Sequence, residues 1–250
     1  MSSLTRDELV AWKENPMQVD HEAHEEACSD GFVYLNDGSA ARCPVCDWQR
    51  HREKLLVEME RAGISRRYLL TEWSKLEMTP MFSRLKEAVA KIGEVLESGM
   101  SAVFTGPPGT GKSTAAALMA RAAIERGHTA HMANIGRISA LVRSGYDGDG
   151  DGWTEAGAIE WLATPDLLVL DDLGAGETRE GSHELKLLYL ALEQRQANGL
   201  IAVVTTNLSE DALRDRLGER VMNRLMPYKV FRFGGKNYRR HRAASWPGLE

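Results

Sequence analysis

The sequence is poor in cysteine and in long apolar runs. It has three cysteines in 250 residues, which is an odd number and too few for a disulfide framework. The apolar stretch "TAAALMARAAI" is interrupted by Arg121, and no run approaches the roughly 20 residues needed to cross a bilayer. The first residues, "MSSLTRDELVAW", lack the basic and apolar stretches of a secretion signal. We therefore expect a cytoplasmic protein with no membrane partner and with reduced thiols.

A strong charge of one sign is also absent from the chain as a whole, because the formal net charge is −5 at pH 7. The charge is unevenly distributed: residues 20–30, "DHEAHEEACSD", are acidic, whereas residues 214–242 hold ten Lys or Arg against two acidic residues. Such a basic run is either a solvated face or a surface for the phosphates of a nucleotide or nucleic acid. With 43% hydrophobic residues, the chain has enough apolar material for one substantial core and a small appendage.

The spacing of apolar residues predicts an α/β fold after an N-terminal region. Thr5 and Glu8 are typical of a capping box that begins a short helix. Residues 47–62 have apolar side chains at helical spacing, and Gly63 follows as a stop signal. Further helices are expected at 83–97, 112–126, 137–143, 155–163, 183–197 and 210–224, and strands at 101–105, 129–134, 167–171, 201–206 and 229–233. This alternation predicts a parallel sheet with helices on both faces.

The stretch "FTGPPGTGKST" (104–114) contains the pattern Gly-x-x-x-x-Gly-Lys-Ser between an apolar strand and an alanine-rich helix. In this context the glycines let backbone amides curl around a β-phosphate at the N-terminus of the helix. Lys112 is placed to reach the β- and γ-phosphates, and the Ser113 hydroxyl to ligate Mg²⁺. The residues expected to bind the nucleotide are Gly106, Pro107, Pro108, Gly109, Thr110, Gly111, Lys112, Ser113 and Thr114.

Two later strands end in polar residues that we expect to face the same crevice. "LLVLDDLG" (167–174) is a buried strand followed by Asp171, a candidate for the Mg²⁺ shell, and Asp172, a candidate to polarise the attacking water. "IAVVTTN" (201–207) ends in Asn207, which is expected to orient the water or to contact the γ-phosphate.

These three motifs, followed by "RLGERVMNRL" (216–225), resemble those of the AAA+ ATPases, and closely those of DnaC/DnaI-type bacterial helicase loaders and their IstB-like relatives. The resemblance runs from about Gly63 to Arg242, and "GERVMNR" is its most specific part. It implies ATP as the nucleotide and head-to-tail self-assembly. It also implies that Arg224 is inserted into the ATP site of a neighbouring subunit, with Arg220 as its support.

The chain departs from the AAA+ pattern at two places. Most AAA+ proteins have Glu at the position of Asp172, and the shorter side chain is expected to activate water less efficiently. Only 17 residues follow Phe233, which is too few for the helical lid that usually carries a sensor arginine. Arg239 is a candidate to take over part of that role.

The cysteines extend the resemblance to the N-terminus, where many such loaders have a small zinc-bearing module. The candidate Zn²⁺ ligands are Cys28, Cys43, Cys46 and His24. A Cys₃His site is ordinary zinc chemistry, and His21 and His51 are the alternatives for its fourth ligand. Three free thiols or a redox Cys-x-x-Cys are the other interpretations, although no thioredoxin-like βαβ unit surrounds the motif.

The resemblance implies an ATP-dependent loader that places a hexameric replicative helicase on single-stranded DNA, in a bacterial cell and encoded by the bacterium or a phage. Residues 1–62 are expected to form the zinc-binding, helicase-interacting module, 63–242 the ATPase domain and 243–250 a tail. An IstB-like transposition helper and a nucleotide-gated adaptor with little hydrolysis are the alternative functions. A small-molecule kinase fits less well, because no arginine-bearing lid is present.

The helix "GRISALVRSGY" (136–146) is where ATPases of this type place their single-strand contacts. It offers Arg137 and Arg143 for phosphates and Tyr146 for base stacking, a combination that suits sequence-tolerant binding of a single strand. The alternative is that these residues form a solvated helix edge.

Overall fold

The computed structural model describes residues 2–69, 71, 73, 76–146, 153–174 and 181–238. Arg239, the tail 243–250 and the side chain of Tyr146, all named above, lie outside the described residues. The chain divides into two compact units, Met1–Glu58 and Met59–Glu250, and the division falls within one helix, α3 (Pro44–Arg61). Of the described helices, none is long and apolar enough to span a membrane.

The first unit is built on a short antiparallel sheet of β1 (Cys28–Ser29), β2 (Phe32–Tyr34) and β3 (Ala40–Arg42). Helix α1 (Arg6–Glu14) begins with the expected capping box: Glu8 N donates to Thr5 Oγ1 at 3.2 Å and Thr5 N donates to Glu8 Oε2 at 2.7 Å. The turn η1 (Pro16–Gln18) and helix α2 (His21–Ala27) follow. The buried residues of this small core are Leu4, Leu9, Ala27, Val33, Leu35, Cys43 and Val45.

The second unit contains the predicted parallel sheet, which is confirmed. Its strands are β4 (Ser101–Thr105), β5 (Ala130–Ala133), β6 (Leu167–Leu170), β7 (Ile201–Thr206) and β8 (Tyr228–Arg232), in the spatial order β5-β6-β7-β4-β8. All four pairings are parallel. Every residue of β4, β6 and β7 is buried, as expected for strands covered on both faces.

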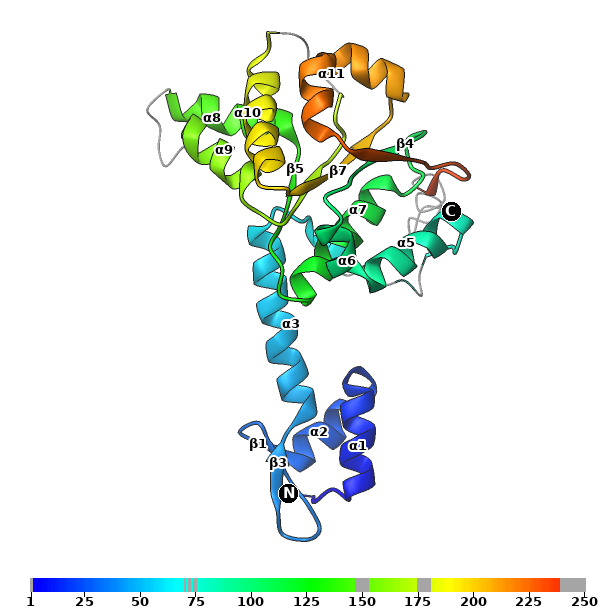
Figure 1. The fold of residues 1–250 in the computed structure, drawn as a ribbon. Helices are drawn as coiled ribbons and strands as arrows, with labels where there is room; N and C mark the ends of the chain where they lie inside the picture. The colour runs from blue at the N-terminus through cyan, green and yellow to red at the C-terminus, as the bar shows by residue number, and fades with distance from the viewer. Residues whose placement is uncertain are drawn as a thin grey trace, which may run out of the picture. The chain divides into compact units, whose positions relative to one another are not determined.

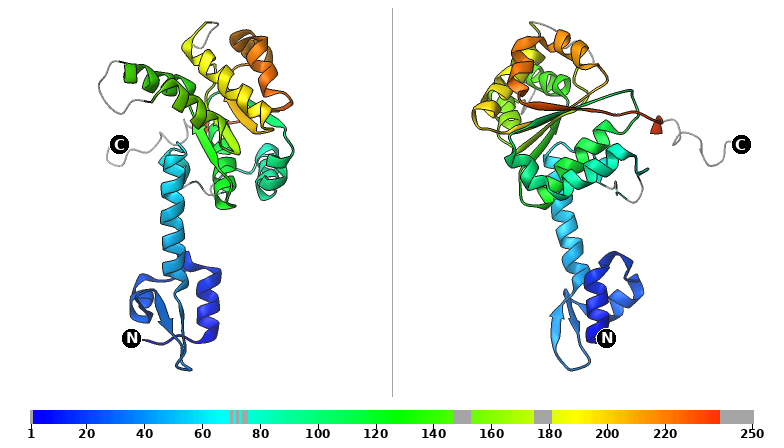
Figure 2. Two further views of the ribbon diagram at one scale, coloured as in Figure 1. Left: turned by 60° about the vertical axis from the view of Figure 1, so that its left-hand side comes forward. Right: turned by 45° about the vertical axis from the view of Figure 1, so that its right-hand side comes forward.

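Helices cover both faces of this sheet (Figures 1 and 2). One face has α5 (Pro80–Ala90), α6 (Ile92–Glu97) and α7 (Lys112–Glu125). The other has α8 (Ile135–Tyr146), α9 (Glu155–Ala163), α10 (His183–Ala197) and α11 (Glu210–Leu225), and the main apolar core lies beneath them. The short helix α4 (Arg66–Leu69) precedes α5 in the chain.

Two of the expected helices are interrupted. The helix predicted at 83–97 is the pair α5 and α6, because Lys91 leaves the helical conformation with φ −112° and ψ 35°. Helix α11 is kinked at Gly218, whose φ of 76° and ψ of 156° are not helical. The segment with Arg220 and Arg224 therefore follows the kink.

One arginine is buried within the sheet-and-helix core. Arg195 on α10 is 1% exposed, and its guanidinium donates only to backbone carbonyls among its described hydrogen bonds. The acceptors are the carbonyl oxygens of Leu162, Ala163, Pro165, Asp166 and Ile201. Arg195 thereby ties α10 to the end of α9, the approach to β6 and the start of β7.

Candidate functional site

The strand order brings the three sequence motifs to one edge of the sheet. Strand β7 lies between β6 and β4, so the carboxyl ends of these three strands are neighbours. The P-loop follows β4, the two aspartates follow β6, and Asn207 follows β7. Ligands of open parallel sheets bind in the crevice at this edge.

The shape of the P-loop depends on its glycines, and Gly106 and Gly111 show why. Gly106 has φ 143°, and a Cβ there would lie 2.0 Å from the carbonyl oxygen of Phe233. Gly111 has φ 92° at the start of α7, and a Cβ there would lie 2.8 Å from Cζ of Phe82. Both contacts are too short for a side-chain carbon, so the loop passes between the segment after β8 and the start of α5.

Lys112 lies against the loop that precedes it. Its side chain is buried, and Nζ donates to the carbonyls of Gly106 at 2.7 Å and Pro107 at 2.8 Å. Nζ also donates to Oδ1 of Asn207 at 2.8 Å. The structure thus joins the predicted phosphate-binding lysine directly to the polar residue at the end of β7.

Asn207 also contacts the predicted base. Its amide Nδ2 donates to Oδ1 of Asp172 at 3.0 Å, so one side chain bridges Lys112 and Asp172. Asp172 is exposed, and its φ of 57° lies in the left-handed region. Residues other than Gly, Asn and Asp seldom adopt this backbone conformation. In this turn the Asp172 carboxylate lies against the side-chain amide of Asn207.

Thr205 organises the aspartate pair and was missed in the sequence analysis. It is 1% exposed; its hydroxyl donates to Oδ1 of Asp171 at 2.7 Å and accepts from the backbone N–H of Asp172 at 2.9 Å. Its position offered a signal, since Thr205 and Thr206 are two hydroxyl residues at the end of a buried, otherwise apolar strand, directly before Asn207. Because one hydroxyl contacts both aspartates, Thr205 fixes their relative placement.

Tyr68 is a second residue that the sequence analysis did not identify. The ring is buried, and Arg67 Nη2 donates to its hydroxyl. Burial, and after it the negative charge of Asp171, raise the pKa of Tyr68, whereas a hydrogen bond with Ser113 lowers it. The phenol therefore lies beside both residues that are expected to hold Mg²⁺. A carboxylate oxygen and a serine hydroxyl, as in Asp171 and Ser113, suit Mg²⁺.

The N-terminal unit brings the predicted zinc ligands together. One ligand atom from each of Cys28, Cys43, Cys46 and His24 lies within 4.8 Å of the others. Cys46 Sγ is 3.6 Å from Cys28 Sγ and 3.4 Å from His24 Nε2. Tetrahedral zinc with ordinary bond lengths separates two sulfurs by about 3.8 Å and a sulfur from a nitrogen by about 3.6 Å. The four residues therefore fit a Zn²⁺ ion.

Local geometry selects His24 from the three histidine candidates. Asp20 caps the N-terminus of helix α2, and its carboxylate accepts from the N–H groups of Glu22 and Ala23 at 3.2 and 3.3 Å. His24 is half-buried on this helix, whereas His21 and His51 are exposed and outside the cluster. Burial, with the neighbouring thiols, raises the pKa of Cys28 to about 12. The raised pKa means that ionising these neighbouring thiols is unfavourable, and the positive charge of a bound cation would offset that cost.

The chain also matches a known protein family and several of its members. Residues 79–241 match the family described as IstB-like ATP-binding protein. The chain belongs to this family. It is 27% identical to YdaV of Escherichia coli K12 over 193 residues, which are 76% of this chain and 75% of YdaV. It is 25% identical to the replicative helicase loader DnaC of Escherichia coli K12 over 196 residues, 78% of each chain.

Solved structures show the same fold. The crystal structure of the DnaC helicase loader has a TM-score of 0.56 at 20% identity and covers 68% of this chain and all of its own. The structure of DnaI has a TM-score of 0.55 at 19% identity, with coverage of 70% and 93%. DnaA from Aquifex aeolicus bound to AMPPCP has a TM-score of 0.52 at 18% identity, covering 66% and 50%. The predicted AAA+ fold and the resemblance to DnaC, DnaI and IstB-like proteins are confirmed.

In this IstB-like protein, Arg224 contacts α10. Its guanidinium hydrogen-bonds with Tyr189, Glu193 and Gln196. The hydrogen bond with Tyr189 is the main cause of the raised pKa of Arg224, and the charge of Glu193 adds to it. Arg224 is thus held against α10 of its own chain.

The candidate DNA contacts on α8 differ in their surroundings. Arg137 is exposed, and its backbone N–H caps the helix on Oδ1 of Asn134 at 3.1 Å. Arg143 is also exposed, but its Nη1 lies 3.5 Å from Oε1 of Glu184. A phosphate would therefore have to compete with Glu184 for Arg143, whereas Arg137 has no described carboxylate partner.

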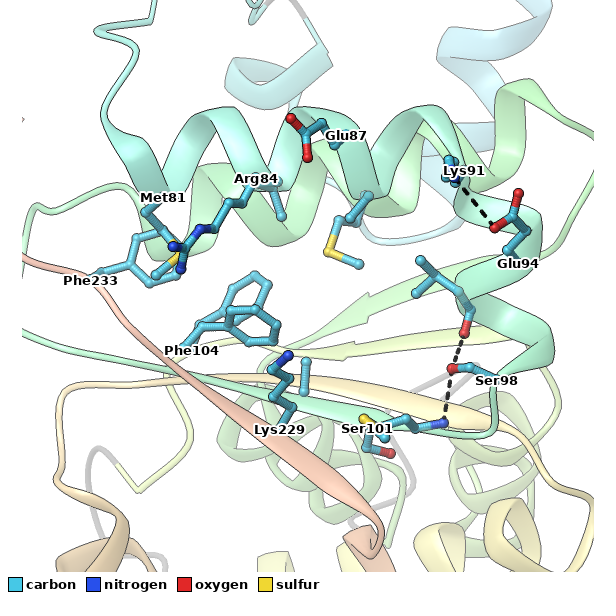
Figure 3. A pocket seen from close by; sticks show the side chains of 17 residues that line it. Met81, Arg84, Glu87, Lys91, Glu94, Ser98, Ser101, Phe104, Lys229 and Phe233 are labelled. Carbon is cyan, nitrogen blue, oxygen red and sulfur yellow. Dashed lines mark hydrogen bonds and ion pairs between the residues drawn. The ribbon is translucent and has the colours of Figure 1, made fainter.

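A cavity of about 600 Å³ lies between the α5–α6 segment and the β4–β8 edge of the sheet (Figure 3). Its walls are mainly apolar, and Phe104 and Phe233 lie at one end together with the charged side chains of Arg84 and Lys229. Of the described residues that line it, none belongs to the predicted nucleotide or metal sites. The cavity is thus distinct from the phosphate crevice.

Proposed function

We propose that this protein is an ATP-dependent loader of a replicative DNA helicase. The observation that carries the proposal is the hydrogen-bonded set of Lys112, Asn207 and Asp172, linked through Thr205 to Asp171, at the sheet edge of an IstB-like ATP-binding protein. Its similarity to DnaC over 78% of both chains supports the loader assignment. Helicase and single-stranded DNA are the partners that follow from this assignment.

Ser113 and Asp171 would hold Mg²⁺, which neutralises charge on the phosphates when bound. When a nucleotide binds, the Lys112 ammonium would replace its hydrogen bonds to the carbonyls of Gly106 and Pro107 with hydrogen bonds to phosphate oxygens. Asn207 holds Oδ1 of Asp172, and the other carboxylate oxygen accepts a proton from the attacking water. Thr205, which contacts the Asp171 carboxylate and the backbone N–H of Asp172, would keep the metal ligand and the base in fixed relative positions.

Two variants test the roles in ATP turnover. Lys112→Ala should lose nucleotide binding or hydrolysis, because the ammonium that contacts the phosphates is gone. Asp172→Asn should bind ATP as the parent does but stop turnover, because an amide does not accept the proton. Turnover by Asp172→Asn at the parental rate would exclude Asp172 as the base. ATP binding with almost no turnover in the parent protein would favour the alternative of a nucleotide-gated adaptor.

Hydrolysis is proposed to occur between subunits that assemble head-to-tail, with Arg224 acting on the neighbouring ATP. Such arginines contribute about 10³- to 10⁵-fold to phosphoryl transfer. Arg224→Ala should bind ATP but hydrolyse it poorly. Mixing Arg224→Ala with Lys112→Ala should restore activity, since each subunit supplies the half that the other lacks. No recovery at any mixing ratio would assign Arg224 a structural role.

We assign the helicase contact to residues 1–62, with Zn²⁺ held by the His24–Cys28–Cys43–Cys46 cluster, and the ATPase to residues 63–242. The test uses the full chain with the hexameric helicase of the organism that encodes it. ATP should promote transfer of that helicase to circular single-stranded DNA, and Lys112→Ala should fail to do so. Binding of a transposase in place of the helicase would favour the IstB-like transposition helper.

A further inference from the structure

Helix α10 presents three polar side chains to Arg224. Tyr189, Glu193 and Gln196 lie on one face of α10, because residues three and four apart share a helix face. Arg224 Nη2 donates to Tyr189 Oη at 3.2 Å and to Glu193 Oε1 at 3.0 Å, and Nη1 donates to Gln196 Oε1 at 3.0 Å. The Tyr189 hydroxyl also donates to Glu193 Oε1 at 3.0 Å. Two of the three acceptors of Arg224, Tyr189 and Glu193, are therefore hydrogen-bonded to each other.

Further contacts hold the end of α11 on these acceptors. Gln196 Nε2 donates to the backbone carbonyl of Asn223 at 3.2 Å, which satisfies one of the last carbonyls of the helix. The guanidinium carbons of Arg220 and Arg224 lie 5.0 and 5.5 Å from the centre of the Tyr189 ring, within the range of cation–π attraction. Both arginines of the "GERVMNR" motif thus contact α10 of their own chain.

Binding of the Arg224 guanidinium to Glu193 and to a neighbouring γ-phosphate at the same time is electrostatically unfavourable. Both partners are anions, and placing them around one guanidinium brings like charges together. The side chains of Arg224 and Glu193 are 35% and 44% exposed, and ion pairs with this exposure are weak. The contact is therefore one that a multiply charged phosphate group can displace.

We propose that Tyr189, Glu193 and Gln196 form a latch that holds Arg224 on its own subunit until the triphosphate of a neighbouring subunit displaces Glu193. This inference rests on the proposed role of Arg224 in trans. The γ-phosphate supplies the charge that competes with Glu193, so the latch opens more readily on ATP than on ADP. The latch thereby couples subunit assembly to the nucleotide state.

Glu193→Gln tests the latch, because it keeps the side-chain length and an acceptor oxygen but removes the charge. Assembly of the full chain is measured by sedimentation velocity over a range of protein concentrations, with a non-hydrolysable ATP analogue or with ADP. The variant should assemble at a several-fold lower concentration, and the preference for the ATP analogue over ADP should narrow. Glu125→Gln is the matched control: it breaks a partly exposed pair with Arg121 on α7 and should leave both measurements unchanged.

An unchanged or higher assembly concentration for Glu193→Gln would overturn the latch. Tyr189→Phe is the second variant: it removes one acceptor but keeps the ring beneath Arg220, and it should shift assembly in the same direction by less. Arg224→Ala separates the two levels of the proposal. If this variant hydrolyses ATP at the parental rate, the role of Arg224 in trans fails and the latch fails with it. If it is inactive while Glu193→Gln behaves as the parent, only the latch is wrong.

Discussion

Replacing His24 by Ala should weaken zinc binding and lower the stability of the whole N-terminal unit. The core of this unit has seven buried residues, one of which is the candidate ligand Cys43. A core this small provides little stability without a metal or disulfide. Structural zinc contributes about 10–16 kcal/mol of apparent binding free energy in small metal-folded modules. We therefore expect the fold of residues 2–58 to depend on the ion.

The expected loss follows from the geometry of the cluster. His24 Nε2 lies 3.4 Å from Cys46 Sγ, so His24→Ala removes one of four converging ligand atoms and leaves its place to water. Loss of a residue that only supports a zinc ligand costs about 10- to 100-fold in affinity, so loss of a direct ligand should cost at least that much. His21→Ala and His51→Ala are the controls, because both side chains are exposed outside the cluster.

Metal analysis of the purified protein should give one zinc per chain. Competition with a chromophoric chelator then ranks the affinities of the parent and the three histidine variants, and the Co²⁺ spectrum reports tetrahedral thiolate coordination. Hydrogen exchange in residues 28–46 should accelerate when the chelator removes the metal. A metal-free protein with parental exchange in this segment would refute the zinc site. Equal affinity in His24→Ala and the parent would refute the choice of ligand.

Three further changes test the core, the catalytic crevice and the DNA contact. Thr205→Val keeps the side-chain shape but removes a hydrogen bond to the Asp171 carboxylate; because such bonds contribute about 1.5–3 kcal/mol, turnover should fall by about 10- to 100-fold in a steady-state ATPase assay, with little change in ATP affinity. Arg195→Met leaves buried carbonyls without a donor and should lower the free energy of unfolding in urea by about 3 kcal/mol. Arg137→Ala/Arg143→Ala should weaken the ATP-dependent, salt-sensitive binding of a labelled single strand, measured by fluorescence anisotropy. Arg137→Ala alone should account for most of this loss, because Arg143 already pairs with Glu184. Unchanged binding by the double variant would show that the DNA contact lies elsewhere.

The elements that sequence patterns predicted correctly depend on local chemistry. The structure confirms the Thr5–Glu8 capping box, the buried strands β6 and β7, and the position of the glycine-rich loop between β4 and α7. Caps, apolar runs and glycine turns involve neighbours in the chain, so local patterns reveal them. The prediction of one helix over 83–97 was wrong in part. The apolar spacing continues through Lys91, but its backbone leaves the helix, so periodicity alone did not reveal the break.

The sequence by itself therefore determined the α/β fold class, the family and the side chains that end the strands. It did not determine the partners that distant segments bring to those side chains. Only the folded chain places Thr205 between Asp171 and Asp172, and only the folded chain joins Lys112 to Asn207, because each depends on the order of strands in the sheet.

The choice of His24 and the partners of Arg224 have the same physical origin. Three histidines lie close to the cysteines in sequence, but the path of α2 brings one of them to the thiols. The arginine motif is visible in the sequence, whereas its contacts with Tyr189 and Glu193 arise where α10 packs against α11, some thirty residues away in the chain. Local patterns specify which groups a protein has, and tertiary packing decides which of them meet.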